Sequence, residues 1–500
     1  MSSKKSSPKP KENVSSDGAL LGFDLLHQLS YLSAISAAGI PRSQIFRLAS
    51  KLPVSTSCYF DEINRLAESM NYDYAEACRV VGERAKDEQV RSLLLRLSGA
   101  LGSGEPEMDF MKREAEIQAE SYGNEYERKV EALKKWTEGY AALVVSAVMI
   151  IVVAAISTMI YDIGIQVVVG LVVVTVVVSA IGAYMIYRAA PQEPTCLPGE
   201  QGKPSQRMPR QLLVMLLPTS VAVSAVMIVA GFSMGWVMIV VAAIIFPLGV
   251  FSGRFDGHVS QRDRDIPTFL RVLGATASAI GTTTAEAMGR IDVRSIAALA
   301  PSVKQLRVRL QSKASTELCW QRFVVDTGSE LVGRTVQVFV DGVRLGGDPD
   351  EVGSRSSIMA MKISFLRARR KAVSVGFSWL TVALHATVVF LLMFVMDIVN
   401  GFGNMLGRAG VADIQSGSAS QASVSVFSFN LQNMHFLQSL MIPVVILLSV
   451  INSMAMQLAD GGYFNKFFLF LSITLLSAGA ATVISPVLAG MIFGIASKPM

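Results

Sequence analysis

The chain has 500 residues, of which 51% are hydrophobic and only 17% are charged, and its formal net charge is +6. Soluble proteins carry about 25% charged residues, and one water-soluble core would not absorb this much apolar surface. The four cysteines are far apart and form no CxxC pair, and there are four histidines. The composition therefore predicts a membrane protein and argues against a zinc site or a disulfide framework.

Seven apolar runs are long enough to cross a bilayer, which takes about 20 residues per helix. None contains Asp, Glu, Lys or Arg. The second run is rich in valine, but its backbone must pair with itself in lipid, so we predict a helix there too. The last run contains Pro486 and is either one tilted or kinked span or two short pieces. The runs are 139–160, 163–187, 212–232, 234–252, 374–396, 436–457 and 467–495.

The basic residues predict how these spans are oriented. Of the 45 lysines and arginines, 42 lie in residues 1–138, 188–211 and 253–373, whereas residues 397–435 carry only Arg408. By the positive-inside rule, the three basic segments are expected in the cytoplasm. The amino terminus is then cytoplasmic, and seven spans place the carboxyl terminus outside.

The chain also shows an internal duplication. In the first copy, a helical hydrophobic pattern is interrupted at Gly39-Ile40-Pro41 and ends at Gly104-Glu105-Pro106. In the second copy, a similar pattern is interrupted at Gly281-Thr282-Thr283 and ends at Gly347-Asp348-Pro349. Gly39 to Pro106 is 67 positions and Gly281 to Pro349 is 68. Each stop precedes a charged segment that runs into an apolar one. We predict two copies of a helical domain. If the first stem continues into its span, it forms a rod of about 50 residues, roughly 75 Å long.

The predicted fold is an all-α polytopic membrane protein with about seven transmembrane helices and two duplicated cytoplasmic helical-bundle domains. In chain order, we expect a disordered tail at 1–18, a first cytoplasmic domain at 19–138, and four spans at 139–252 with a basic loop at 188–211. These are followed by a second cytoplasmic domain at 253–373 and about three spans at 374–500 with an outer loop at 397–435.

Catalytic patterns are missing from the sequence. Gly202-Lys203 is followed by Pro204 and lacks the earlier glycine of a P-loop, and there is no HExxH motif. We predict no enzyme activity, no cofactor, and no catalytic or metal-binding residue. His385 is the one titratable group expected inside a span, where a hydrogen bond between helices is favoured over a proton relay. Asn452, Ser453 and Gln457 are expected to join helices in the same way.

A transporter and a membrane sensor are two alternative functions for such a membrane protein. Ion-coupled transporters usually carry charged groups at mid-membrane, but a transporter built from unwound helices and backbone carbonyls would not need them. A membrane sensor would need an output domain, and neither cytoplasmic segment has a kinase-like or nucleotide-binding motif.

The two cytoplasmic segments differ in charge. The net charge is −2 over residues 1–138 and +7 over residues 253–373. Different charge favours different protein partners, or different faces of one partner. Attraction of the basic segment to anionic lipid is the alternative explanation.

Four short stretches resemble the type II secretion F family, which supplies the inner-membrane platform proteins of type II secretion and type IV pili. They are residues 24–31, 38–41, 71–77 and 103–106. The chain is most similar to the archaeal branch, the FlaJ/TadC-like platform subunits of archaella and archaeal pili. The resemblance covers nearly the whole chain after the tail, and it is weaker in the second copy, where Gly281-Thr282-Thr283 replaces the Gly-Ile-Pro turn.

The resemblance implies a non-catalytic platform in the cytoplasmic membrane. Such a protein couples a hexameric secretion ATPase to the assembly of pilin or archaellin subunits, with a homodimer expected and no nucleic acid bound. The charged residues around the two matched turns and their stems are then candidate partner-binding residues: Glu105, Arg113, Asp348, Lys362, Arg367, Arg369 and Arg370. Helix capping by Glu105 and Asp348, and a purely topological role for residues 367–371, are alternative roles.

Overall fold

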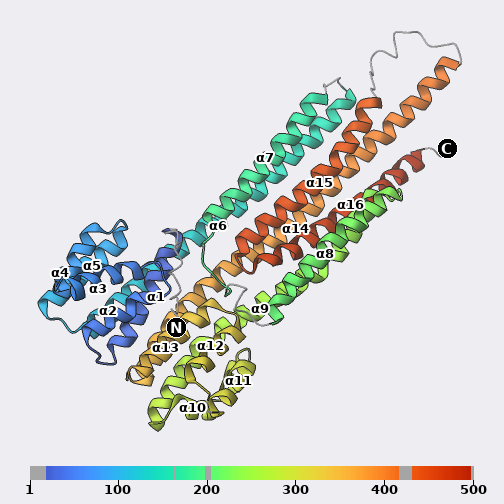
Figure 1. Cartoon of the computed structure of the whole chain (residues 1–500). Helices are drawn as coiled ribbons and strands as arrows, with labels where there is room; N and C mark the ends of the chain where they lie inside the picture. The colour runs from blue at the N-terminus through green and yellow to red at the C-terminus, as the bar shows by residue number, and fades with distance from the viewer. Residues whose placement is uncertain (1–17, 161–164, 198–203, 313, 416–430, 497–500) are drawn as a thin grey trace, which may run out of the picture. The chain divides into compact units, whose positions relative to one another are not determined.

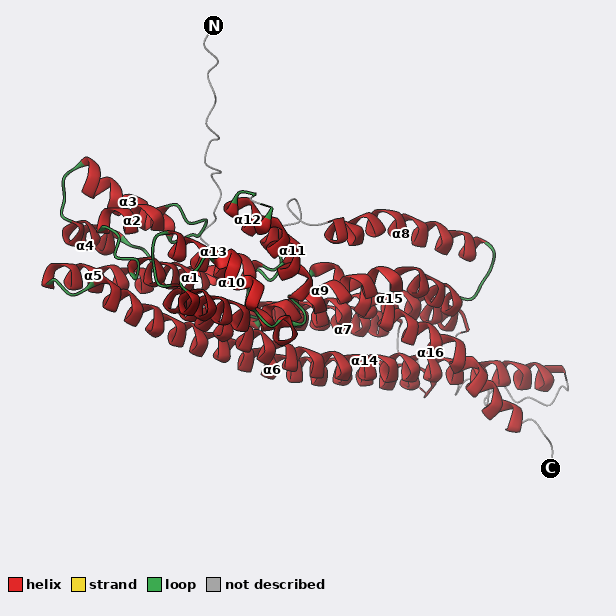
Figure 2. Ribbon diagram, turned by 90° about the horizontal axis from the view of Figure 1, so that it is seen from below, coloured by secondary structure: helices red, strands yellow, loops and turns green. Residues whose placement is uncertain are grey.

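The computed structural model describes residues 18–160, 165–197, 204–312, 314–415 and 431–496. These residues form helices joined by short connections and contain no β-strand (Figures 1 and 2). The predicted tail, the turn after the first span and residues 416–430 of the predicted outer loop lie outside the described residues. The all-α prediction is therefore confirmed for the described residues.

Seven helices are long and apolar enough to cross a membrane, as predicted. They are α6 (Glu107–Ile160), α7 (Ile165–Ala189), α8 (Pro204–Val229), α9 (Met234–Ile280), α14 (Pro349–Gln415), α15 (Leu431–Asp460) and α16 (Phe467–Ala496). The first stem does continue into its span, because α6 is one helix of 54 residues, about 80 Å long at 1.5 Å per residue. The last run is also a single helix that contains Pro486.

The chain divides into two compact units. The first comprises, within the described residues, Met1–Glu127, Pro191–Gln201 and Val259–Leu366. The second comprises Arg128–Ala190, Gly202–His258 and Arg367–Met500. Three helices, α6, α9 and α14, have residues in both units, so each of them passes from one unit into the other without a break.

The first copy of the repeated domain consists of α1 to α5. These helices are α1 (Gly18–Ser36), α2 (Arg42–Ser50), α3 (Ser57–Ser69), α4 (Tyr74–Arg84) and α5 (Glu88–Ser103). Asp73 begins α4 by accepting a hydrogen bond from the amide of Ala75, and Asp87 does the same for α5 with Gln89 and Val90. Gly104 ends α5 in the left-handed conformation, with φ of 75°, which glycine adopts without steric cost.

The second copy consists of residues 265–280 of α9 followed by α10 to α13. Its elements are α10 (Thr284–Ala287), two short 3-10 turns (Met288–Arg290 and Val293–Ile296), α11 (Ala300–Gln311), α12 (Thr316–Thr327) and α13 (Glu330–Arg344). The break at Gly281 has φ of 64°, the same as at Gly39 in the first copy. The turn is thus kept although its sequence differs.

Two aspartates reveal the duplication in three dimensions. Asp24 on α1 accepts a hydrogen bond from the amide of Ser55 at 2.9 Å. Asp265 on α9 accepts one from the amide of Ala298 at 2.8 Å. Each aspartate occupies the start of its copy and holds a connection about thirty residues further along the chain. The repeated pattern predicted from the sequence is therefore a repeated structure.

The two copies share one hydrophobic core inside the first unit. Helices α1 and α13 pack together across the pair. Polar contacts flank this packing: Arg334 donates to Asp24 at 2.8 Å, and the Tyr31 hydroxyl donates to Asp341 at 3.2 Å. Burial raises the pKa of both Tyr31 and Asp341 above their ordinary values. The copies are thus two halves of one folded body.

The second unit is the apolar bundle, in which α15 packs against α7 and α16 (Figure 1). Glycines bring α9 and α16 close together: a Cβ on Gly235 would lie 3.1 Å from the carbonyl oxygen of Gly479, and one on Gly249 would collide with Leu469. Small residues let membrane helices approach in this way. Helix α14 continues to Gln415, well past the expected end of its span at residue 396.

One span, α8, is much less buried against the rest of the protein than the other spans. Only 6% of the most apolar stretch of α8 is buried against protein, compared with 33% to 50% for the other six spans. Its side chains Met215, Val221, Val226 and Val229 are all strongly exposed. In a bilayer this helix therefore has apolar surface available to lipid or to another membrane helix.

Candidate functional site

The arginines of the first copy are matched by carboxylates. Arg47 lies 3.1 Å from Glu68, and Arg79 lies 2.5 Å from Glu76 and 2.7 Å from Glu83. The same holds for the remaining arginines from α2 to α5, which pair as Arg42–Glu107, Arg65–Asp61, Arg84–Glu62, Arg91–Glu88 and Arg96–Glu114. All seven arginines in this part of the chain are thus neutralised locally.

The second copy is different, because most of its exposed cations have no counter-ion. Six side chains are exposed and make no ion pair within the described part of the chain. We call these residues the unpaired cations of the second copy: Arg271, Arg290, Arg294, Lys304, Arg307 and Arg322. This set carries six uncompensated positive charges, so the two homologous copies present different electrostatic surfaces.

The two predicted residues of the first copy contact each other. Arg113 on α6 lies 2.6 Å from Glu105, and its guanidinium lies 5.9 Å from the centre of the Phe110 ring. The Glu105 side chain thus contacts a residue eight positions further along, on the second turn of the following helix. The pair is solvent-accessible, with 54% of the Arg113 side chain exposed, so both groups remain within reach of a partner.

The predicted residues of the second copy are spread over several environments. Asp348 accepts a hydrogen bond from the Ser278 hydroxyl at 2.8 Å, which ties the turn before α14 to α9. Lys362 is half-buried beside Gly123 of α6, and a Cβ at that glycine would collide with the lysine. The end of the Lys362 side chain therefore lies against the backbone of α6 at Gly123.

The predicted arginine cluster on α14 does not present one surface. Arg369 is exposed, Arg367 is half-buried, and Arg370 is only 5% exposed. The Arg370 Nε donates to the carbonyl oxygen of Ala459 at 3.1 Å, and its Nη2 donates to that of Leu458 at 3.1 Å. Arg370 therefore closes the carboxyl end of α15 and holds it against α14.

Beside Arg370 lies a buried ion cluster that the sequence analysis did not predict. Asp460 is 2.6 Å from Lys371 and 2.5 Å from Lys466, and Asp256 lies 3.4 Å and 3.5 Å from the same two lysines. Asp256 also accepts a hydrogen bond from the amide of Tyr463 at 3.1 Å. The cluster joins α9, α14 and the turn between α15 and α16.

The glycines of that turn are required by the cluster. Gly461 has φ of 67°, and a Cβ there would collide with the Arg370 guanidinium. A Cβ on Gly462 would collide with the Asp256 carboxylate. The sequence Asp460-Gly461-Gly462 between two apolar runs could have indicated such a turn. Its partners on α9 and α14 are about 200 and 90 positions away, so no local pattern revealed them.

Within the bundle, the predicted hydrogen bonds between spans are confirmed for His385, Asn452 and Ser453. The prediction for Gln457 was wrong, because its side chain instead donates to the backbone carbonyl oxygens of Gly462 and Tyr463 in the turn after its own helix. His385 Nδ1 is 3.0 Å from Asn452 Nδ2, and His385 Nε2 is 3.0 Å from Ser449 Oγ. The Tyr140 hydroxyl donates to Asn452 Oδ1 at 2.6 Å. Ser453 bonds Thr474 at 2.9 Å. These contacts join α6, α14, α15 and α16.

Comparison with known proteins finds a family match in the part of the chain that holds the first copy and its first span. Residues 29–155 match the model of the family described as type II secretion system (T2SS), protein F. This region begins in α1 and ends in the apolar part of α6, so it contains most of the first copy and its first span. No solved structure matches the chain.

Two curated proteins are similar to the chain over most of its length. One is named flagella accessory protein J of Methanococcus voltae and is 23% identical over 415 residues, covering 80% of this chain and 72% of the relative. The other has the same name, comes from Methanocaldococcus jannaschii, and is 22% identical over 410 residues with the same coverage.

These relatives extend the similarity well beyond the matched domain, since 80% of the chain must include much of the second copy and its spans. The resemblance stated from the sequence is thus confirmed. The chain is a multi-pass membrane protein whose residues 29–155 match the type II secretion system protein F family, and over most of its length it is similar to the archaeal flagella accessory protein J.

Proposed function

We propose that the protein is the non-catalytic platform subunit of a machine that assembles a type IV filament, such as an archaellum or a pilus. The observation that carries this proposal is the match of residues 29–155 to the protein F family, together with similarity over 80% of the chain to proteins named flagella accessory protein J. The seven apolar helices support its placement as a multi-pass protein in the cytoplasmic membrane, with the amino terminus inside and the carboxyl terminus outside.

In this proposal the first unit binds a hexameric secretion ATPase in the cytoplasm. The unpaired cations of the second copy support this, because they would gain counter-ions from an acidic protein surface. The first copy, whose arginines are already paired, would gain much less. The accessible pair Glu105–Arg113 belongs to the same proposed contact area. The exposed Arg369 lies in the second unit and would be a separate contact, whereas Arg370 and the half-buried Lys362 would act by positioning helices.

The ion cluster supports a mechanical role for the second unit. Helices α9 and α14 each run from the first unit into the second, and the cluster fixes both of them to the turn between α15 and α16. A displacement of these stems in the first unit would therefore move the end of the last helical hairpin. This is how motion driven by nucleotide turnover in the ATPase would reach the membrane.

Helix α8 is the proposed meeting point with membrane-embedded pilin or archaellin subunits. Its apolar surface is almost unburied by the protein itself, and filament subunits must leave the bilayer beside the platform. A homodimer would place two such helices around a growing filament.

Complementation of a host strain that lacks the gene tests the proposal. The wild-type gene is expected to restore surface filaments visible by electron microscopy. A variant with Arg290, Arg294 and Arg307 changed to Glu is expected to reach the membrane but leave cells bare. The matched control changes Arg47, Arg79 and Arg84 of the first copy to Glu, and it is expected to reduce filaments less. Normal filaments in the deletion strain would refute the proposed function.

A further inference from the structure

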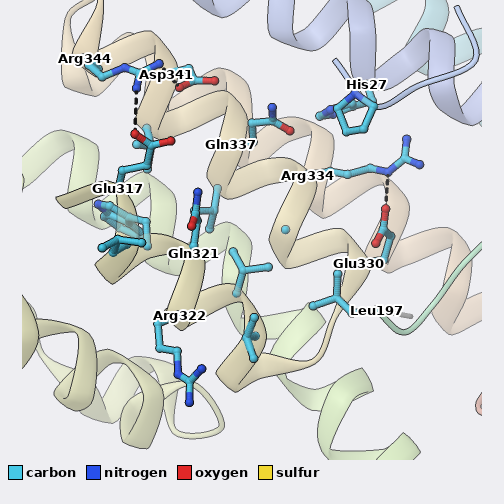
Figure 3. A pocket seen from close by; sticks show the side chains of 18 of the residues that line it. His27, Leu197, Glu317, Gln321, Arg322, Glu330, Arg334, Gln337, Asp341 and Arg344 are labelled. Atoms are coloured by element: carbon cyan, nitrogen blue, oxygen red, sulfur yellow. Dashed lines mark hydrogen bonds and ion pairs between the residues drawn. The ribbon is translucent and has the colours of Figure 1, made fainter. Parts of the chain in front are cut away.

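A groove of about 890 Å³ lies in the first unit where the two copies meet (Figure 3). Helices α12 and α13 of the second copy form most of it, and α1 and the segment Pro53–Val54 of the first copy complete it. Residues along the whole of α13, from Glu330 to Arg344, line the groove. A helix of 15 residues is about 22 Å long, so the groove is elongated rather than a compact pocket.

The lining has the character of a protein interface. Val324, Val336, Val340 and Trp320 provide an apolar interior, and Leu318 is 64% exposed. Charged residues border this interior, as Figure 3 shows. The guanidinium of Arg334 lies 3.0 Å from Glu330, and that of Arg344 lies 3.8 Å from Glu317. An apolar centre with a polar rim is typical of protein–protein contacts, and a groove of this length suits a helix.

His27 gives the groove an unmet hydrogen-bonding requirement. Its side chain is fully buried on α1 and lines the groove, near Gln337 and Arg334 in Figure 3. Neither Nδ1 nor Nε2 has a hydrogen-bond partner among the described residues. Burial, helped by the charge of Arg334, lowers the pKa of His27 to about 3. The neutral ring offers one donor and one acceptor, and leaving these buried groups unpaired is unfavourable.

The charge of the surroundings indicates the occupant. Arg322 on α12 lines the groove, is exposed, and has no ion pair within the described part of the chain. It is one of six unpaired cations in the same copy. The other charged lining residues pair among themselves: Arg334 with Glu330, and Arg344 with Glu317 and Asp341. Arg322 and the other unpaired cations of this copy would therefore attract an occupant that carries acidic groups. The accessible, elongated shape would leave a small molecule largely exposed, whereas a helix would cover the apolar interior.

We propose that this groove binds an acidic amphipathic helix of the cytoplasmic partner, which places an apolar side chain on the valine floor and a hydrogen-bonding side chain against His27. The inference rests on the proposed function, in which that partner is the secretion ATPase. It adds that the ATPase binds where the two copies meet. The shape of the groove, as well as surface charge, then determines which partner binds.

The test uses the full-length protein in detergent and the purified secretion ATPase of its host. A photoreactive benzoylphenylalanine replaces Leu318 in the groove or, as a matched control, Met70 after α3 of the first copy, whose side chains are 64% and 61% exposed. Irradiation at position 318 is expected to give a covalent complex with the ATPase whose attached segment, identified by mass spectrometry, is acidic and helical. Position 70 is expected to give little.

Two further variants measure affinity. Val340→Trp fills the groove and is expected to weaken ATPase binding at least tenfold, whereas Met70→Trp in the first copy leaves it unchanged. His27→Leu removes the unpaired nitrogens, so it is expected to keep or raise thermal stability while weakening binding about tenfold.

The results distinguish the groove inference from the proposed function. If the wild-type protein binds the ATPase but the position 318 and 70 adducts are equal, or Val340→Trp and His27→Leu bind as the wild type does, the groove inference is wrong and the proposed function stands. If the wild-type protein does not bind the ATPase at all, both are wrong.

Discussion

The guanidinium of Arg370 on α14 donates a hydrogen bond to the carbonyl oxygen of Ala459, 3.1 Å away at the end of α15. The last carbonyls of a helix have no partner within it, and a positive charge there is favourable. The bond therefore satisfies a helix terminus and fixes one membrane helix to another. The residue that the sequence suggested as a partner contact is thus also a structural link inside the second unit.

Arg370→Ala is expected to destabilise the detergent-solubilised protein by about 2–4 kcal/mol, because it leaves buried carbonyls unpaired. The measurement is thermal unfolding followed by circular dichroism, which reports the loss of helix in both units. Arg254→Ala, an exposed arginine on α9 near the same cluster, is the control and should change the unfolding temperature little. Equal effects of the two substitutions would contradict the assigned role.

Asp460→Asn is expected to cost about 3–5 kcal/mol, because it leaves Lys371 and Lys466 facing each other with one carboxylate between them. Lys466→Met in the same chain should recover part of that loss, since it removes one of the two unmatched charges. A double-mutant cycle on unfolding temperature measures the coupling. Strictly additive effects would show that the three groups do not act as a cluster.

His27 should make the protein sensitive to acid. Its pKa is lowered to about 3 in the folded state, so between pH 6.5 and 3 the unfolded chain binds one more proton than the folded chain. The free energy of unfolding therefore falls as the pH falls through that window, by about 3 kcal/mol between pH 6.5 and 4. Asp341, whose raised pKa acts in the opposite direction, is common to all variants compared.

His27→Gln is expected to flatten this pH dependence, measured as unfolding temperature between pH 4 and pH 7. His258→Gln, at an exposed histidine of α9, should follow the wild-type curve. Parallel curves for the wild type and His27→Gln would mean that His27 is not held neutral.

The exposed pair Glu105–Arg113 should matter little for stability. Surface ion pairs contribute about 0–1 kcal/mol, so Glu105→Gln is expected to leave the unfolding temperature within about 2 °C of the wild type. If the pair contacts a partner, the same variant will bind that partner more weakly. A large loss of stability would instead assign the pair a structural role.

Much of the fold followed from the sequence because its signals are local. Apolar runs of about 20 residues gave the seven spans, and glycines near Gly39 and Gly281 marked the same turn twice. Charge counts over 1–138 and 253–373 pointed to a difference between the copies. The structure adds that the side chains of Arg47 and Arg79 pair with carboxylates, whereas those of Arg290 and Arg294 make no ion pair within the described residues. This pairing depends on which helix faces pack together, so it appeared only in the structure.

The candidate sites were harder to predict, because they join distant segments. Arg370 was singled out with its neighbours as a basic run, yet Leu458, Ala459 and Gly461 determine what it does. The groove is assembled from His27 and from helices about 300 residues later. Spacing within a sequence does not reveal contacts between segments that are this far apart in the chain. The repeated pattern could have suggested that the copies pack together, but not which side chains would meet.

The most direct test of the central claim is a titration of the detergent-solubilised protein with its host's secretion ATPase, with ATP turnover recorded at low and high salt. The account predicts binding that alters turnover, weakens with salt, and is lost when Arg290, Arg294 and Arg307 become Glu but survives reversal of Arg47, Arg79 and Arg84. An absence of binding by two folded proteins would contradict the platform function and leave transport across the membrane as the activity to assay next.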